Sequence, residues 1–562
     1  MLPTLSALAP AYRPRRPTET VLYSVVRDYL ETFLAHARDS YEAPLPRYVE
    51  DELRDYLKCG VFAHGFVRAH CDACGQDLLV AFSCKARSVC PSCAGRRMAN
   101  TAANLVDRVL PAVPVRQWVL SLPWELRALA AFKADVLSAL ARLFVEAIFA
   151  RYRRWAKEQG VGEAPSGAVT HVQRFGSSVN LNVHFHVMVL DGVFTRDAQG
   201  RPMFHPAPSP THAELDQVVR QVHRRALAWL TRRGHVVACS EPRSQDAPTP
   251  TFLDACAAIA MARGTVRAVR DDRDAEQESA ARIEPSPADE SAVEHGGFNL
   301  HASVAVAAGD DLGRERLMRY GARPPLALDR LTRLPGGRIG YRIKKLRNGR
   351  AKHRVMTPLE FLARLAAIVP PPRYPLLRYH GVLGPRSSWR RDVVPKAPAA
   401  TSREERLPTR DREVEFTAIT ALDHARPSTH RSRSCGERVR STPPAPVVDR
   451  VLTSDRGNDT AAVLPKAVLL APNVLSTKHW SRLLGGSLYA ASPRIDWATL
   501  LRRSFEVDVL CCASCGGRLR VLGEVTEPAL VGLVLESLGL PREVPTVSRA
   551  RDPTDLMGAD AD

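Results

Sequence analysis

Residues 170–190 read THVQRFGSSVNLNVHFHVMVL, and this stretch decides the fold. From Asn180 to Leu190 apolar and polar residues alternate, which is the period of a β-strand with one buried face. Residues 170–175 precede a Gly-Ser-Ser turn and continue the pattern, so the stretch predicts an antiparallel hairpin. Side chains two positions apart on a strand share a face. We therefore expect His184 and His186 to point the same way and to be able to share one cation.

The strand before the turn offers a third ligand for that cation. Gln173 could complete the set and leave open positions for substrate oxygens, while His171 has the same strand parity and competes with it. Two imidazoles by themselves favour zinc or another transition metal.

A second part of the core follows much later in the chain. Residues 116–123 (RQWVLSLP) and 298–307 predict two further strands, and residues 312–320 predict a short helix that ends at Gly321. Tyr320 closes this helix among several arginines: Arg314, Arg316, Arg319 and Arg323. A phenol becomes a nucleophile only where cations favour the phenolate, and the same arginines would bind a phosphodiester. Packing of the ring at a helix end is the alternative interpretation.

Cysteines cluster near the N-terminus, where six of the twelve fall between Cys59 and Cys93. Two CxxC pairs separated by fifteen residues predict one tetrahedral structural zinc, with the ligands Cys71, Cys74, Cys90 and Cys93. The spacing leaves open whether nearby side chains substitute for these or add to them: Cys59, Cys84, His64 and His70. Arg96 and Arg97 belong to a basic group around the module that either contacts DNA phosphates or is a solvated charged face.

A last CxxC, formed by Cys512 and Cys515, supplies only half of a tetrahedral site. It is either a pair of structural thiols or a ligand pair for zinc shared with another region or chain.

Composition points to a polyanionic partner. The 562 residues carry 79 Lys and Arg against 60 Asp and Glu, a formal charge of +19. We find no uncharged apolar run of membrane-spanning length, and residues 1–20 contain Pro and Arg where a signal peptide would be apolar. The sequence therefore predicts a cytoplasmic protein with no membrane partner.

Changes in composition suggest six segments along the chain. They are a helical and zinc-binding domain (1–105), a first part of the core (106–240), an acidic insertion (241–295), a second part of the core (296–385), a flexible linker (386–476) and a small C-terminal domain with the last CxxC (477–562).

Several motifs in this order resemble the rolling-circle transposases of the insertion sequence 91 family. They are CGVFAHGF (59–66), CDAC (71–74), SCKARSVCPSC (83–93), RQWVLSLP (116–123), the stretch around the paired histidines, RYGARPPLALDRL (319–331) and LCCASCGGRLRVL (510–522). The resemblance implies an α+β fold. Its parts are an HUH nuclease core with a central antiparallel β-sheet flanked by helices, a helical zinc-binding domain before it and a small C-terminal domain after it.

The resemblance also implies a chemistry. His184, His186 and Gln173 would bind catalytic Mg²⁺ or Mn²⁺, and Tyr320 would attack single-stranded DNA at the ends of the mobile element and at the target site. The product would be a 5′-phosphotyrosine, and the enzyme would act in the bacterial cytoplasm at the nucleoid. Arg319 and Arg323 would contact the DNA. Typical relatives have two tyrosines four residues apart on this helix, and here Arg316 stands at the first position.

Two alternatives to a transposase remain at the level of sequence. A plasmid relaxase or replication initiator would use the same chemistry, although the N-terminal cysteine module favours the transposase. A non-catalytic zinc-containing DNA-binding protein would bind DNA without forming a covalent adduct.

Overall fold

The computed structural model describes residues 15–162, 164–235, 249–262, 266–268, 292–345, 351–395, 498, 500–501 and 508–552. These residues divide into two compact units. The larger unit holds the described residues of 16–59, 83–395 and 545–552, and the smaller unit holds residue 15, residues 60–82 and the described residues of 498–544.

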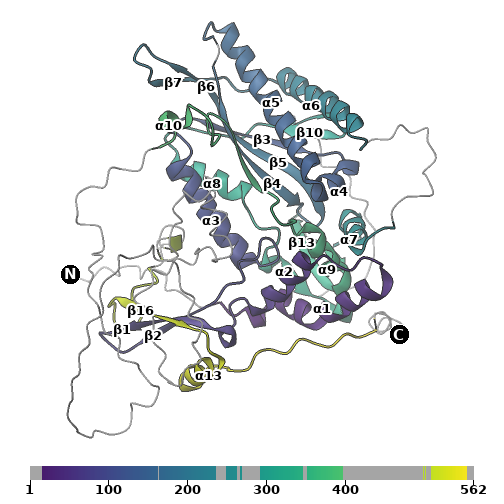
Figure 1. Cartoon of the computed structure of the whole chain (residues 1–562), viewed down its shortest axis with the longest axis vertical. Coiled ribbons are helices and arrows are strands. Elements are labelled where there is room, and N and C mark those ends of the chain that lie inside the picture. The colour runs from purple at the N-terminus through teal and green to yellow at the C-terminus, as the bar shows by residue number, and fades with distance from the viewer. Residues whose placement is uncertain are drawn as a thin grey trace, which may run out of the picture. The chain divides into compact units, whose positions relative to one another are not determined.

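An antiparallel sheet forms the centre of the larger unit (Figure 1). Its strands are β3 (Val115–Ser121), β4 (Gly167–Phe175), β5 (Leu181–Leu190), β9 (Ala292–His295), β10 (Phe298–His301), β11 (Ala305–Val306) and β15 (Leu377–Gly381). The order is β15-β4-β5-β3-β10-β9, and β11 also pairs with β3. The predicted hairpin is β4 and β5, and the predicted strand at 116–123 is β3. The strand predicted at 298–307 is two short strands, β10 and β11.

Helices cover both faces of this sheet, which confirms the predicted α+β class. On one face Trp118 of β3 lies against Tyr152 of α5 (Ala134–Glu158), with ring centroids 6.4 Å apart. Helix α6 (His212–Arg232) packs on α5, β9 and β10, and α4 (Trp124–Phe132) contacts β5. On the opposite face lie α3 (Pro91–Arg108) and α8 (Asp311–Gly321), which pack on each other.

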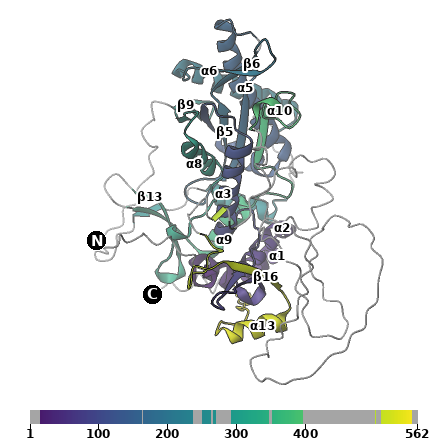
Figure 2. The same cartoon turned by 90° about the vertical axis from the view of Figure 1, so that its left-hand side faces the viewer.

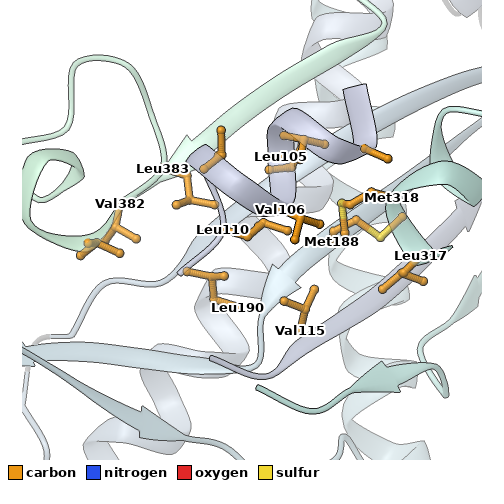
Figure 3. Close-up of a cluster of buried hydrophobic side chains, with 14 of the residues drawn as sticks. Leu105, Val106, Leu110, Val115, Met188, Leu190, Leu317, Met318, Val382 and Leu383 are labelled. Carbon is orange, nitrogen blue, oxygen red and sulfur yellow. The ribbon is translucent and has the colours of Figure 1, made fainter. Parts of the chain in front are cut away.

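A buried apolar cluster seats α3 and α8 on the sheet (Figure 3). Its members come from four parts of the chain and include Leu105, Val106, Val115, Met188, Leu190, Leu317, Met318, Val382 and Leu383. Leu317 and Met318 are consecutive residues of α8 and are both buried, so they anchor the second half of this helix. The helix predicted at 312–320 is thereby fixed against the hairpin that carries the two histidines.

The N-terminal helices complete the larger unit. Helix α1 (Val21–Ser40) packs on α2 (Arg47–Lys58) and on α9 (Pro358–Ile368), and α9 packs on α7 (Phe252–Met261). Phe252 of α7 contacts Phe33 of α1, with ring centroids 5.0 Å apart. Helix α7 falls inside the segment predicted to be an acidic insertion, so that segment supplies part of the core. Residues 236–248, 263–265 and 269–291 of this region lie outside the described residues.

The larger unit also contains a second, four-stranded sheet and a two-stranded hairpin. The strands β12 (Leu331–Arg333), β13 (Ile339–Lys345), β14 (Ala351–Met356) and β8 (Val266–Ala268) form a four-stranded sheet. Its β13 ribbon stands apart from the central sheet in Figure 2. Strands β6 (Gly192–Arg196) and β7 (Pro202–Pro206) form a separate hairpin. The short helix α10 (Arg390–Val393) packs Val393 into the apolar cluster. The fold therefore continues past 386, where the linker was predicted to begin, and residues 396–476 lie outside the described residues.

The described residues of the smaller unit include a three-stranded antiparallel sheet and the helix α13 (Pro528–Ser537). The strand order is β16-β1-β2, formed by β1 (Phe66–Cys71), β2 (Asp77–Ala81) and β16 (Leu519–Val525). Helix α13 packs on the turn at Phe62–His64. Its small core contains Phe66, Leu79, Val525, Val531 and Leu535. This unit therefore combines parts of the two segments that were predicted as separate N-terminal and C-terminal domains.

Candidate active site and cysteine clusters

The two histidines lie on the face of the central sheet that α8 covers. In the register of β4 and β5, His184 stands opposite Gln173 and His186 stands opposite His171. Residues directly opposite on antiparallel strands share a face, so all four side chains lie on one side of the sheet, as the strand period predicts. The ring centroids of His184 and His186 are 4.9 Å apart.

Hydrogen bonds fix one nitrogen of each imidazole. His184 Nδ1 lies 2.9 Å from the Asn182 carbonyl oxygen, to which it can only donate, so its Nε2 retains the lone pair. His186 Nδ1 lies 3.0 Å from the side-chain amide of Gln117 on β3. His186 Nε2 is buried and has no hydrogen-bond partner among the described residues. The amide atom that faces Nδ1 is Gln117 Nε2, which donates, so the proton of the neutral His186 ring lies on Nε2 in this arrangement. A half-turn of the Gln117 amide would present its oxygen to Nδ1, and His186 Nε2 would then be able to bind a cation.

Burial keeps these imidazoles neutral at physiological pH. It lowers the pKa of His184 to about 4, although the bond to the Asn182 carbonyl acts in the opposite direction. Burial, together with the neighbouring His184 and His171, lowers the pKa of His186 to about 2. The positive charge of Arg323 contributes to both shifts. Neutral imidazole is the form that binds metals, so neither ring has to lose a net proton first, and His186 needs only to carry its proton on Nδ1.

Gln173 connects the sheet to the end of α8. Its Nε2 donates to the carbonyl oxygens of Tyr320 and Gly321, both at 2.9 Å, and its Oε1 accepts from Arg323 Nε at 3.3 Å. As a predicted metal ligand Gln173 stays a prediction, since its amide oxygen keeps a second lone pair. Among the described residues no histidine, cysteine or carboxylate joins His184 and His186 in a metal-sized cluster, and this includes His171.

Tyr320 reaches the histidine pair from the last turn of α8. Its ring centroid lies 5.3 Å from that of His186, edge to face, and the residue is 47% exposed. The Arg323 guanidinium lies over the ring at 5.0 Å. Gly321 allows this approach because a Cβ there would lie 2.9 Å from the His171 ring and from Met188 Cε. Sequence reasoning identified neither Gln117 nor this close contact, because both depend on how distant segments pack.

The arginines of α8 differ in what they contact. Arg314 is buried and donates to the Pro111 carbonyl at 2.7 Å, so it supports the helix. Arg319 pairs with Glu315 at 2.6 Å. Arg316 stands one turn before Tyr320 and is exposed. Arg323 therefore lies beside the candidate nucleophile, and Arg316 is exposed one turn away on α8. The DNA contacts of Arg319 and Arg323 stay predictions.

The cysteines form two clusters, and neither is the one predicted from spacing. One contains Cys59, Cys84, Cys90 and Cys93, and the other contains Cys71, Cys74, Cys512 and Cys515. The predicted site is wrong because its two CxxC pairs separate and each joins different thiols. Cys59 and Cys84, which spacing could not rank, complete the first cluster.

The first cluster lies at the start of α3. Sulfur–sulfur distances are 3.6 Å for Cys59–Cys90 and for Cys84–Cys93, and 3.7 Å for Cys59–Cys93. Four sulfurs at this spacing fit one tetrahedral zinc. Glu52 of α2 accepts three hydrogen bonds from the loop before Cys90, from Ser88 N, Ser88 Oγ and Val89 N. Sequence reasoning missed this carboxylate, because a glutamate on a helix surface has no distinguishing pattern.

Arg97 also supports this loop. It donates to the carbonyl oxygens of Lys85, Ala86 and Arg87 at 2.9 to 3.1 Å. Its neighbour Arg96 is partly buried in the same turn of α3. The proposed DNA contacts of both residues stay predictions, and Arg97 has a structural role in addition.

Comparison with protein families identifies the class of protein. Residues 167–390 match the family described as "Putative transposase", and residues 25–122 match the family described as "Transposase zinc-binding domain". The chain is thus a DNA-processing enzyme, a transposase. The order of the two matches, a zinc-binding domain and then a transposase domain, is consistent with a transposase of the insertion sequence 91 family. No match was found among curated proteins or among solved structures.

These matches confirm a structural zinc and DNA as a partner. The first cysteine cluster falls wholly within the matched zinc-binding domain. None of the described helices combines the length and the apolar character that crossing a bilayer would take.

Proposed function

We propose that this transposase cleaves and rejoins single-stranded DNA through a covalent bond between Tyr320 and a 5′ phosphate. The observation that carries the proposal is the position of Tyr320. Its half-exposed ring lies 5.3 Å from His186, on the same sheet face as His184 and beneath Arg323. A nucleophile, a pair of neutral imidazoles and a guanidinium meet at one place, which is the arrangement that phosphoryl transfer needs.

The reaction is a transesterification with balanced bonds. The Tyr320 oxygen attacks the scissile phosphorus in line and forms an O–P bond, while the bond from phosphorus to the upstream 3′ oxygen breaks. The tyrosine hydroxyl loses its proton, and the departing 3′ oxygen gains one. Because one phosphodiester replaces another, rejoining is the same step in reverse and needs no ATP.

The side chains of the site have separate tasks in this scheme. Arg323 binds the phosphate and lies over the Tyr320 ring, so it holds substrate and nucleophile together. Gln173 holds the end of α8 at a fixed distance from β4. Arg316 meets the DNA backbone one turn away. Each of these side chains either positions a group or stabilises charge. These two effects supply most of the catalysis of phosphoryl transfer.

A divalent cation fits the histidine pair. The lone pair on His184 Nε2 supplies one ligand atom, the buried His186 Nε2 supplies a second once the Gln117 amide oxygen faces His186 Nδ1, and Gln173 Oε1 is the third candidate. Bound Mg²⁺ or Mn²⁺ would polarise a non-bridging phosphate oxygen. Imidazole ligands favour Mn²⁺ of these two.

A single tyrosine on α8 constrains the strand-transfer scheme. With Arg316 in the position of the other tyrosine, either Tyr320 acts in successive steps or two subunits contribute one tyrosine each. Arg316 would in both cases serve substrate binding.

The experiment is an adduct assay with labelled single-stranded oligonucleotides from the element ends and Mn²⁺, read on a denaturing gel. We expect wild type to form a covalent band and Tyr320→Phe to form none while binding DNA as well as wild type. Tyr341→Phe is the matched control, since Tyr341 is 3% exposed on β13 and should not matter. An adduct in Tyr320→Phe, or none in wild type under any cation, would contradict the proposal.

The cation has its own variant in the same assay. His184→Ala should lose the adduct, or form it slowly, at every Mg²⁺ or Mn²⁺ concentration. Binding of DNA should persist, because Arg316 and Arg323 are unchanged. A wild-type rate in His184→Ala would remove the histidine pair from the mechanism.

A further inference from the structure

The second cysteine cluster lies in the smaller unit and joins residues that are far apart in the chain. Cys74 and Cys512, whose sulfurs are 3.6 Å apart, are separated by 438 positions. The family match to the zinc-binding domain covers residues 25–122 and so includes only half of this cluster. We propose that Cys71, Cys74, Cys512 and Cys515 bind a second structural zinc that fastens the C-terminal segment to the β1–β2 hairpin.

The sulfur positions fit a metal and do not fit disulfides. The distances Cys71–Cys515 and Cys74–Cys512 are 3.5 and 3.6 Å, and all four sulfurs lie within 4.8 Å of one another. Tetrahedral zinc with bonds of about 2.3 Å separates its sulfurs by roughly 3.8 Å. A disulfide would bring one pair to about 2.05 Å. Four thiols converging on one point is the donor set of zinc.

The two halves of the cluster are built in the same way. In the first, Cys71 N donates to the Gln76 carbonyl at 2.9 Å and Gly75 N donates to the Cys71 carbonyl at 2.8 Å. In the second, the equivalent bonds run from Cys512 N to the Gly517 carbonyl at 2.7 Å and from Gly516 N to the Cys512 carbonyl at 2.9 Å. Gly75 and Gly516 occupy the same left-handed conformation, with φ of 75° and 72°.

This repetition shows two matched knuckles facing one centre. A tight turn that directs two thiols to one side is what a tetrathiolate site requires of each half.

Packing around the centre leaves no space for a larger side chain. A Cβ at Gly517 would lie 3.2 Å from Cys515 Sγ and 3.3 Å from Cys71 Sγ. Cys71 and Cys512 are buried beside Leu519 and Ala69, whereas Cys74 and Cys515 are exposed. Next to the knuckles, Arg520 of β16 forms a two-bond pair with Asp72, at 3.0 Å each.

The zinc has a physical task in this unit. Its apolar core is small, and β16 reaches its place beside β1 from the other end of the chain. Units of this size rarely hold together by apolar burial alone and use metals or disulfides instead. Metal binding would supply the missing free energy, since the site exists only when both segments are folded together.

A chemical-protection experiment on the full-length wild type tests the site without any substitution. Native protein is alkylated with iodoacetamide, and the modified cysteines are identified by mass spectrometry. Cys511 is the internal control, because it is exposed, its thiol donates to the Gly516 carbonyl, and it is not a member of the four-thiol cluster among the described residues.

We expect Cys511 to react while Cys74 and Cys515, although exposed, stay protected until a chelator is added. Equal reactivity of all three before chelation would overturn the proposal. Protection that is lifted by a reductant and not by a chelator would overturn it too, since that outcome indicates a disulfide.

Metal content gives the second readout. Wild type and Cys511→Ser should contain two zinc per chain, and Cys512→Ser should contain one, retained by the cluster of Cys59 and its partners. One zinc in wild type, two in Cys512→Ser, or iron in place of zinc would each contradict the proposal.

Discussion

Replacing Gly321 by alanine tests whether the close approach of α8 to the sheet positions Tyr320. In a helix, alanine is favoured over glycine by about 1 kcal/mol. Here the new Cβ would lie 2.9 Å from the buried His171 ring and 2.9 Å from Met188 Cε. The thioether end can move, whereas the His171 ring is 2% exposed and is enclosed by the sheet and α8. Overpacking of this kind costs about 1 to 3 kcal/mol.

The helix preference of alanine offsets part of the cost of overpacking in the free energy of unfolding, but it does not restore the position of Tyr320. We expect Gly321→Ala to change the free energy of unfolding by about 0 to 2 kcal/mol towards instability. The strain is relieved by moving the end of α8 outward by a few tenths of an ångström, which displaces Tyr320. Since a displacement of 1 Å can cost about a hundredfold in rate, a fall of roughly tenfold in adduct formation is expected.

The matched control is Gly95→Ala. Gly95 lies within α3, and a Cβ at this position would meet no neighbouring atom within 4 Å, so alanine should stabilise by about 1 kcal/mol and leave the rate unchanged. Both variants are measured by denaturant unfolding and by the rate of covalent adduct formation. If Gly321→Ala is as stabilising as Gly95→Ala and forms the adduct at the wild-type rate, the close approach does not position the tyrosine.

Three further outcomes are expected. Glu52→Ala leaves three hydrogen-bond donors of the loop at Ser88 without their acceptor, so unfolding should become easier by roughly 2 to 4 kcal/mol and a chelator should remove the zinc of the first cluster faster. Burial lowers the pKa of His171 to about 4. In metal-free protein the free energy that the neutral His171 contributes to stability is therefore fully present above about pH 6.5, and it is lost as the pH falls towards 4, because the unfolded chain binds the proton first. It amounts to at most about 3 kcal/mol, and His171→Gln should flatten this part of a plot of Tm against pH. Arg316→Tyr should permit a second attachment point on α8, which mass spectrometry of the adduct can locate. If only Arg316→Tyr forms the adduct and wild type does not, two tyrosines are required.

Much of the candidate active site could be predicted from the sequence because it depends on local periodicity. The alternation along β5 determines that His184 and His186 share a face, whatever packs above them. The Gly-Ser-Ser turn sets the hairpin, which brings Gln173 opposite His184. Helix α8 and its end at Gly321 were likewise readable from residue types.

Tertiary structure decided which groups the Gln173 side chain contacts. Its amide bonds to the carbonyls of residues 320 and 321, some 147 positions away, only because Leu317 and Met318 dock α8 on the sheet. The same docking brings Tyr320 to His186. A strand period cannot predict which helix will cover a face, since apolar burial is not directional.

The cysteines show the same division most clearly. Sequence alone determined that this chain binds zinc, because paired CxxC motifs are a local signature. It could not determine which pairs share an ion, since all thiols are chemically equivalent and any two knuckles satisfy a tetrahedral centre. One signal was present: CDACG at 71–75 and CASCG at 512–516 both carry the glycine of the knuckle, whereas Cys93 is followed by Ala94. The pairing of β1 with β16 decided the match, because only a folded sheet places residues from opposite ends of the chain within one coordination sphere.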